Sequence, residues 1–180
     1  MTRPIGIYEK ATPKNFTWRE RLAFAKELGF DFVEMSVDES DSRLARLDWT
    51  KKERLDVVQA IYETGIRIPS ICFSGHRRYP LGSNDPKTEA TSLEMMKKCI
   101  ELAQDLGVRT IQLAGYDVYY EEKSPETRAR FIKNLRKACD WAEEAQVILA
   151  IEIMDDPFLN SIEKYLAVEK EIDSPYLFVY

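Results

Sequence analysis

A helix-to-strand junction recurs along this chain at nearly regular intervals. At Gly29, Gly65 and Gly107 a polar, helix-like segment ends in glycine, and an apolar, β-rich segment follows. A fourth junction has Gln146 in place of glycine. The intervals between these four positions are 36, 42 and 39 residues, and one strand with its crossover helix needs about 30 residues or more. Because glycine adopts the left-handed conformation that ends a helix, the pattern predicts a repeated β/α unit.

The repeat predicts six strands and five helices. The expected strands are short apolar runs, typical of parallel strands covered by helices, at residues 5–8, 32–36, 68–74, 110–114, 148–153 and 177–180. Helix starts are expected after Thr17 and Thr50, each followed three residues later by a glutamate that completes a capping box. Ser124 precedes a proline at a third helix start, and Ser161 opens the last helix.

This alternation predicts an α/β fold, and two architectures fit it. A doubly wound sheet usually carries a Gly-x-Gly phosphate loop after its first strand, whereas residues 8–13 here read YEKATP. The absence of that loop favours an incomplete (β/α)8 barrel of the TIM type, with about five β/α units plus a sixth strand, since a whole barrel needs about 250 residues. No linker or composition shift divides the chain, so residues 1–180 are expected to form part of one domain.

Charge, hydropathy and cysteine usage exclude several classes of partner. The formal net charge of −5 argues against nucleic acid, which requires a clustered positive field. No apolar run approaches the roughly 20 residues of a membrane span. Cys72, Cys99 and Cys139 are odd in number and have no metal-ligand spacing, and the last two fall in helical patterns where buried thiols are expected. A reducing cytoplasm fits this usage.

Two carboxylates stand out because they end strands. Glu152 lies in an otherwise apolar run, where an unpaired carboxylate costs several kcal/mol. It is either a metal ligand or acid/base residue, or a buried carboxylate paired to a Lys or Arg of a neighbouring strand. Glu34 ends the second strand in the same way and either holds a neighbouring loop or strand or contacts a substrate.

The loop after the third strand contains the only histidine. His76, Arg77 and Arg78 follow one another there, and such a trio suits a phosphate or a sugar hydroxyl. The alternative is a solvated basic loop. One histidine cannot build a multi-histidine zinc site.

Several segments resemble the L-ribulose-5-phosphate 3-epimerase (L-xylulose-5-phosphate 3-epimerase) family, one of the xylose-isomerase-like TIM barrels. They are GIYEKA (6–11), GFDFVEMSVDE (29–39), HRRYPLGS (76–83), IQLAGYDVYY (111–120) and EIMD (152–155). The resemblance implies an isomerase of carbohydrate metabolism that interconverts L-xylulose 5-phosphate and L-ribulose 5-phosphate in L-ascorbate utilisation. Its substrate is a phosphorylated pentulose, and its location is cytoplasmic.

The resemblance also implies a divalent metal ion, Zn²⁺, Mn²⁺ or Mg²⁺, held by two Glu, one Asp and one His. Such an ion stabilises an enediolate while two glutamates move the proton at C3. Glu152 matches the first ligand and one acid/base residue. The family's Asp ligand comes just beyond the position of Tyr180, so its later ligands have no counterpart in this sequence.

These 180 residues are therefore expected to lack a retained metal and to be inactive by themselves. Open edges at the first and sixth strands also predict a homo-oligomer. The alternatives are a non-catalytic fragment, a sugar-binding module, or a relative of the abasic-site endonucleases, which would need several histidines and a basic face.

Overall fold

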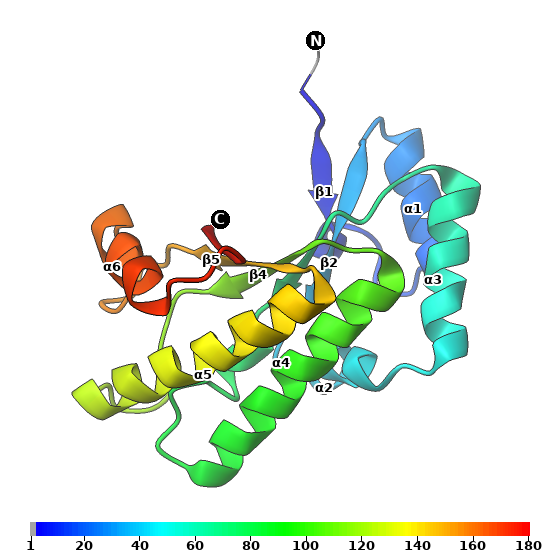
Figure 1. The fold of residues 1–180 in the computed structure, drawn as a ribbon. Coiled ribbons are helices and arrows are strands. Elements are labelled where there is room, and N and C mark those ends of the chain that lie inside the picture. Colours follow the sequence, from blue (N-terminus) through cyan, green and yellow to red (C-terminus); the bar gives the residue numbers. More distant parts are fainter. Residues whose placement is uncertain (1–2) are drawn as a thin grey trace.

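The computed structural model describes residues 3–180 and contains a six-stranded, entirely parallel sheet (Figure 1). The strands are β1 (Gly6–Tyr8), β2 (Phe32–Val37), β3 (Ser70–Phe73), β4 (Thr110–Ala114), β5 (Ile148–Glu152) and β6 (Leu177–Val179). All six expected strands are confirmed, and the largest change in a boundary is that β3 begins at Ser70 rather than at residue 68. The strands lie in chain order from β1 to β6, so β1 and β6 form the two edges.

The order of the strands decides between the two architectures. A doubly wound sheet reverses its strand order and carries helices on both faces, whereas right-handed crossovers between successive strands place every helix on one face. The long helices are α1 (Trp18–Glu27), α3 (Lys51–Thr64), α4 (Pro86–Leu106), α5 (Pro125–Ala145) and α6 (Ile162–Ile172). Figure 1 shows neighbours in this series side by side, α1 against α3 and α4 against α5. The prediction of an incomplete, barrel-type α/β fold is confirmed.

The ends of the helices follow local sequence signals. Thr17 and Thr50 form the expected capping boxes. At the start of α5 the Ser124 N–H donates to Thr127 Oγ1 at 2.9 Å, so a threonine completes the box in place of a glutamate. Gln146 follows α5 in the left-handed conformation, with φ of 56°, and terminates the helix as glycine does at the other junctions.

The two faces of the sheet differ in character. The side chains of Val33, Met35, Ile71, Ile111 and Leu149 are fully buried, and they belong to one hydrophobic core with the inward faces of the helices. Successive side chains point to opposite faces, and apart from Phe32 and Ile148 the alternate residues of these strands are polar or small. The strands are therefore not uniformly apolar as the sequence suggested. Along the described part of the chain, no helix is long and apolar enough to cross a bilayer.

Four short helical segments were not predicted. They are the helix α2 (Asp41–Leu44) and the 3₁₀ turns η1 (Glu9–Ala11), η2 (Ala45–Asp48) and η3 (Gly75–Arg77). Segments of three or four residues carry no readable periodicity. They are nevertheless important, because η1, α2 and η2 bring charged groups together at the carboxyl ends of β1 and β2.

A buried carboxylate joins these segments. Glu9 is fully buried, and Arg46 donates to both of its oxygens, at 2.6 and 2.7 Å. Arg43 donates to Oε1 as well, and the Ser36 N–H of β2 donates to Oε2 at 2.8 Å. Arg21 of α1 donates to the Glu9 carbonyl at 3.1 Å and lies 3.8 Å from Oε1. Glu9 thus connects β1, α1, β2, α2 and η2.

We expect Glu9→Gln to lower the free energy of unfolding by about 3 kcal/mol, because removing one partner leaves the buried charges of the other uncompensated. Urea denaturation at neutral pH measures this loss. Glu27→Gln, an exposed position on α1, is the matched control and should change stability by less than about 0.5 kcal/mol. Equal effects of the two substitutions would contradict a structural role for the Glu9 cluster.

Candidate functional site

The polar face of the sheet gathers side chains from strands that are far apart in the chain. Parallel strands in sequential order bring all their carboxyl ends to one edge. Glu152 ends β5 as predicted, whereas Glu34 is the third of the six residues of β2 and does not end that strand; both side chains lie half-buried on the polar face. The structure thus brings together the two carboxylates that the sequence singled out.

Glu34 is held by hydroxyl groups. Ser70 of β3 donates to its Oε1 at 2.7 Å, and the Tyr180 hydroxyl donates to the same oxygen at 3.1 Å. Tyr180 follows β6, and three strands separate β6 from β2. The hydrogen bond therefore requires a strongly curved sheet whose polar face is concave. Burial raises the pKa of Tyr180 to about 12, with a further contribution from the Glu34 charge, so Tyr180 stays a donor at neutral pH.

Glu152 has a neutral partner. Gln112 of β4 donates its Nε2–H to Glu152 Oε2 at 2.6 Å, so the partner is an amide and not the Lys or Arg considered from sequence. Gly115 N–H donates to the Glu152 carbonyl at 3.0 Å. A Cβ at Gly115 would lie 2.5 Å from that oxygen, so only glycine allows this approach. Burial raises the pKa of Glu152, and the Glu34 charge raises it further against the opposing Gln112 hydrogen bond.

Tyr8 and Cys72 continue the polar face towards β1. The Tyr8 hydroxyl donates to Ser36 Oγ at 2.9 Å, and burial raises the pKa of Tyr8. Burial also raises the pKa of the Cys72 thiol, so a thiolate nucleophile is disfavoured here. Cys99 and Cys139 are buried free thiols, as predicted.

His76 lies apart from this face. Its ring is buried, packs against Phe73 with ring centroids 4.5 Å apart, and has Nε2 3.2 Å from the Ser92 carbonyl of α4. Burial lowers the pKa of His76 to about 4, so the ring carries no positive charge at neutral pH. The substrate-binding role of His76 stays a prediction, and in this conformation the ring faces α4.

Arg77 and Arg78 contact acidic and aromatic side chains of neighbouring loops. Arg77 Nη1 lies 3.6 Å from Glu39 Oε1, and its guanidinium stacks 4.7 Å from the centre of the Tyr119 ring. Arg78, which is exposed, pairs with Asp41 at 2.7 Å. Both arginines border the carboxyl ends of the strands. Their predicted contact with substrate stays a prediction.

Sequence reasoning missed three contributors, Gln112, Tyr180 and Glu9. Gln112 and Tyr180 have ordinary polar side chains, and only the register of the strands reveals that they meet Glu152 and Glu34. Glu9 could have been singled out, because it directly follows the first strand.

A divalent metal needs several oxygen or nitrogen ligands. Within residues 3–180, no group of three or more His, Cys, Asp or Glu side chains is placed to hold one. Glu34 and Glu152 supply carboxylates, but their nearest partners are hydroxyl and amide donors. The residues described here thus do not by themselves fit a metal centre.

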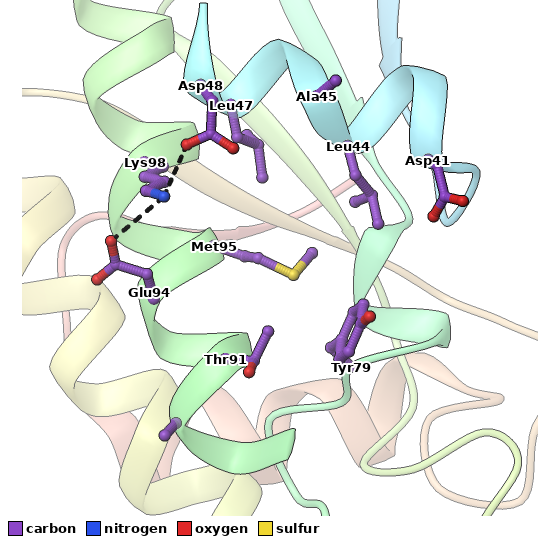
Figure 2. Close-up of a pocket in the computed structure, with 11 residues that line it drawn as sticks. Asp41, Leu44, Ala45, Leu47, Asp48, Tyr79, Thr91, Glu94, Met95 and Lys98 are labelled. Atoms are coloured by element: carbon purple, nitrogen blue, oxygen red, sulfur yellow. Dashed lines mark hydrogen bonds and ion pairs between the residues drawn. The ribbon is translucent and has the colours of Figure 1, made fainter. Parts of the chain in front are cut away.

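A cavity of about 510 Å³ lies between the α2–η2 segment and α4, on the helix side of the molecule (Figure 2). Its charged groups engage one another, since Lys98 pairs with Asp48 at 2.7 Å and with Glu94 at 3.5 Å. Figure 2 shows the Met95 side chain projecting from α4 between these segments. Because these charged groups are already paired with one another, the polar face of the sheet is the stronger candidate site.

The raised pKa of Glu152 predicts a pH dependence of stability. The folded protein binds this proton more tightly than the unfolded chain, so the contribution of Glu152 is most favourable at low pH. It falls as the pH rises above the ordinary value of 4.5 and through the raised folded-state pKa. Relative to the wild type, Glu152→Gln should therefore gain stability with increasing pH.

Urea denaturation of both proteins, on either side of that ordinary pKa, measures this trend. Glu144→Gln, exposed on α5, is the control and should show no trend. A stability difference for Glu152→Gln that is constant or shrinks with rising pH would contradict the assignment.

Similar proteins of known structure share this fold. A D-psicose 3-epimerase from Clostridium cellulolyticum H10 superposes with a TM-score of 0.83 at 17% identity, over 98% of this chain and 62% of that one. An L-ribulose 3-epimerase superposes with a TM-score of 0.75 at 22% identity, over 99% and 60%. At these identities the likeness concerns the fold alone.

Comparison of sequences finds relatives of much higher identity. The chain is 56% identical over 177 residues to the L-ribulose-5-phosphate 3-epimerase UlaE of Salmonella schwarzengrund (strain CVM19633), and equally so to that of Salmonella dublin. The match covers 98% of this chain, which spans 62% of the length of these relatives. The family model described as "Xylose isomerase-like TIM barrel" matches residues 22–180. Together with the sequential parallel sheet, this match shows that the chain belongs to the xylose isomerase-like TIM barrel family.

Proposed function

We propose that residues 1–180 form the N-terminal part of one barrel domain of a sugar-phosphate epimerase that interconverts L-ribulose 5-phosphate and L-xylulose 5-phosphate. The 56% identity to L-ribulose-5-phosphate 3-epimerases over nearly the whole chain supports this substrate class. The observation that carries the proposal is the concave polar face that holds both carboxylates, on which the Glu34 charge helps to raise the pKa of Glu152.

Glu152 is the proposed acid/base residue. Epimerisation at C3 requires a base to remove the proton beside the carbonyl and an acid to return one on the opposite face. A carboxyl group whose pKa is raised towards neutrality is a better match for both tasks than an ordinary carboxylate. The Gln112 hydrogen bond orients the carboxylate of Glu152, and the Gly115 N–H fixes its backbone, which suits a group that must reach one particular proton.

Glu34 is the proposed hydrogen-bond acceptor for a sugar hydroxyl. Ser70 and Tyr180 both donate to Oε1 and fix the position of the carboxylate on the polar face. Arg77 and Arg78 are proposed to contact substrate from the loop after β3. His76 is proposed to contribute to substrate binding indirectly, by holding that loop against α4.

We further propose Glu152 as the one ligand that this part of the protein contributes to a divalent ion, Zn²⁺, Mn²⁺ or Mg²⁺. The ion would supply charge stabilisation at the substrate oxygens. A single carboxylate binds such ions weakly, so the 180 residues are not expected to retain one.

The 180-residue chain alone should show no C3 epimerisation of L-ribulose 5-phosphate with added Mn²⁺, whereas the product of the full reading frame should turn over. In that longer protein Glu152→Gln should lower kcat by about 10²–10⁴-fold, because a general acid/base is lost. Glu144→Gln is the matched surface control. Turnover by the 180 residues, or an inactive longer protein, would contradict the proposal.

A sugar-binding module is the second candidate, favoured by the lack of a metal-ligand group among residues 3–180. Such a module would bind L-ribulose 5-phosphate equally well with and without a chelator. The net charge of −5 and the single histidine give no support to an abasic-site endonuclease.

We also propose a homo-oligomer in the cytoplasm. Free cysteines suit a reducing compartment, and cell fractionation tests the location.

The proposal of a homo-oligomer rests on the edge strand β6. It exposes apolar side chains, with Phe178 49% and Val179 42% exposed, and exposed edges pair readily.

Light scattering should therefore give a mass above that of one chain, and Val179→Lys should reduce it because charge on an edge strand opposes pairing. Leu55→Lys, at a 62% exposed position on α3, is the control. A monomeric wild type would refute the oligomer.

A further inference from the structure

Lys123 joins two loops at the carboxyl ends of the strands. It lies in the loop that leads from β4 to α5, and its Nζ donates to Asp117 Oδ1 at 2.8 Å and to the Val118 carbonyl at 2.6 Å. The same Nζ lies 3.1 Å from Oδ2 of Asp156, in the loop after β5. The side chain of Asp117 is 3% exposed and that of Asp156 12%. One ammonium group thus neutralises two largely buried carboxylates, and the three residues form the Lys123 cluster.

Asp117 provides a fixed point for this cluster. Its Oδ2 accepts from Thr127 Oγ1 of α5 at 2.5 Å, and its carbonyl accepts from the Gly82 N–H at 3.1 Å. A Cβ at Gly82 would lie 2.8 Å from that carbonyl oxygen, so the loop after β3 packs closely against it. Lys123 therefore connects the loop after β5 to a point that α5 and the loop after β3 already hold.

The loop after β5 comprises residues 153–161 and begins next to Glu152, the last residue of β5. Pairing between strands fixes the backbone only as far as Glu152. The Met154 N–H donates to the Leu159 carbonyl at 3.0 Å and closes the loop, and Leu159 packs against Gly115. The position of this loop thus decides how firmly the candidate acid/base residue is held on its C-terminal side.

The two oxygens of Asp156 have different partners. Oδ1 accepts from the Phe158 N–H at 2.9 Å, a contact that belongs to the turn of the loop itself. Oδ2 faces Lys123, and among the residues that the structure describes no other ion pair joins the loop after β5 to the loop after β4. Asp156→Asn would keep the oxygen of the turn and lose the charge, so the two contacts can be tested separately.

The position of Lys123 is unfavourable for the helix that follows it. Lys123 directly precedes Ser124, the N-cap of α5, and the helix dipole opposes a cation at a helix N-terminus. Ion pairs between buried groups also contribute little net stability. Natural sequences retain local conflicts of this kind mainly where a site needs them. Stabilisation of α5 or of the fold is therefore a poor explanation of the Lys123 cluster.

We propose that Lys123 is a positioning residue: by pairing with Asp156 it holds the loop after β5 against the loop after β4 and keeps Glu152 aligned for proton transfer. Lys123 itself touches neither the carboxylate of Glu152 nor the polar face. A displacement of about 1 Å at a reacting group can cost about 100-fold in rate. The effect on turnover rests on the proposed function, whereas the ordering of the loop by Lys123 does not.

Amide hydrogen exchange of the 180-residue chain, followed by NMR, tests the ordering of the loop. Asp156→Asn should accelerate exchange at Met154 by at least about tenfold, while amides within β4 and β5 keep their wild-type rates. Lys123→Gln should have a larger effect, because it leaves Asp117 and Asp156 close together without a cation. The double variant Lys123→Gln/Asp156→Asn should be no worse than Lys123→Gln, since the repulsion is removed with the second charge.

Epimerisation by the product of the full reading frame tests the positioning role. Asp156→Asn and Lys123→Gln should each lower kcat by about 10–100-fold and change KM for L-ribulose 5-phosphate by less than about threefold, because alignment is lost and binding is not. Lys123→Arg keeps the charge and should retain kcat within about threefold. The controls Asp140→Asn and Lys133→Gln remove the same charges from exposed positions on α5 and should leave both constants unchanged.

Three results would overturn the proposal. The first is wild-type exchange at Met154 in both single variants. The second is faster exchange with unchanged kcat, which would make the Lys123 cluster a structural contact only. The third is a loss of kcat in Lys123→Arg as large as that in Lys123→Gln, which would exclude a role for the charge. If the longer protein shows no epimerase activity at all, the proposed function fails and the role in turnover fails with it, while accelerated exchange in the variants still establishes that Lys123 orders the loop.

Discussion

Packing of all the long helices against one face of a parallel sheet is the constraint on which the rest of this structure depends. Every second strand residue must be apolar to fill the core, as Val33, Ile111 and Leu149 do, and each such side chain contributes about 1.5–3 kcal/mol when fully buried. The residues between them point to the opposite face and need not be apolar. The same packing thus determines which face can carry Glu34, Gln112 and Glu152, and it provides the stability that offsets their partial burial.

The curvature of the sheet brings side chains from distant strands of the polar face together. The Tyr180 hydroxyl reaches Glu34 across three intervening strands, which a flat sheet would forbid at a strand spacing of about 4.8 Å. On the resulting concave surface Glu34 raises the pKa of Glu152. In a flat sheet, β2 and β5 would lie about 14 Å apart, and the Glu34 charge would have much less effect on Glu152. The electrostatics of the candidate site are therefore a consequence of sheet geometry as much as of the residues themselves.

The sequence predicted what depends on local signals and missed what depends on distant contacts. Helix ends at Gly65, Gly107 and Gln146 and the caps at Thr17 and Thr50 arise within a few residues, so the strands and long helices were predictable. Glu9 meets Arg43 and Arg46 across 34 and 37 residues, and no periodic pattern reports such a contact. The position of His76 was equally hidden, because burial against Phe73 and α4 is decided by tertiary packing.

The Glu9 cluster contains more positive charge than one carboxylate can balance, and such an arrangement costs stability. Natural sequences retain local conflicts of this kind mainly where a site needs them. The conflict here lies at the carboxyl ends of β1 and β2, the end of a barrel that carries chemistry. The excess charge is thus better explained by the needs of a site at this end of the strands than by a contribution to the fold.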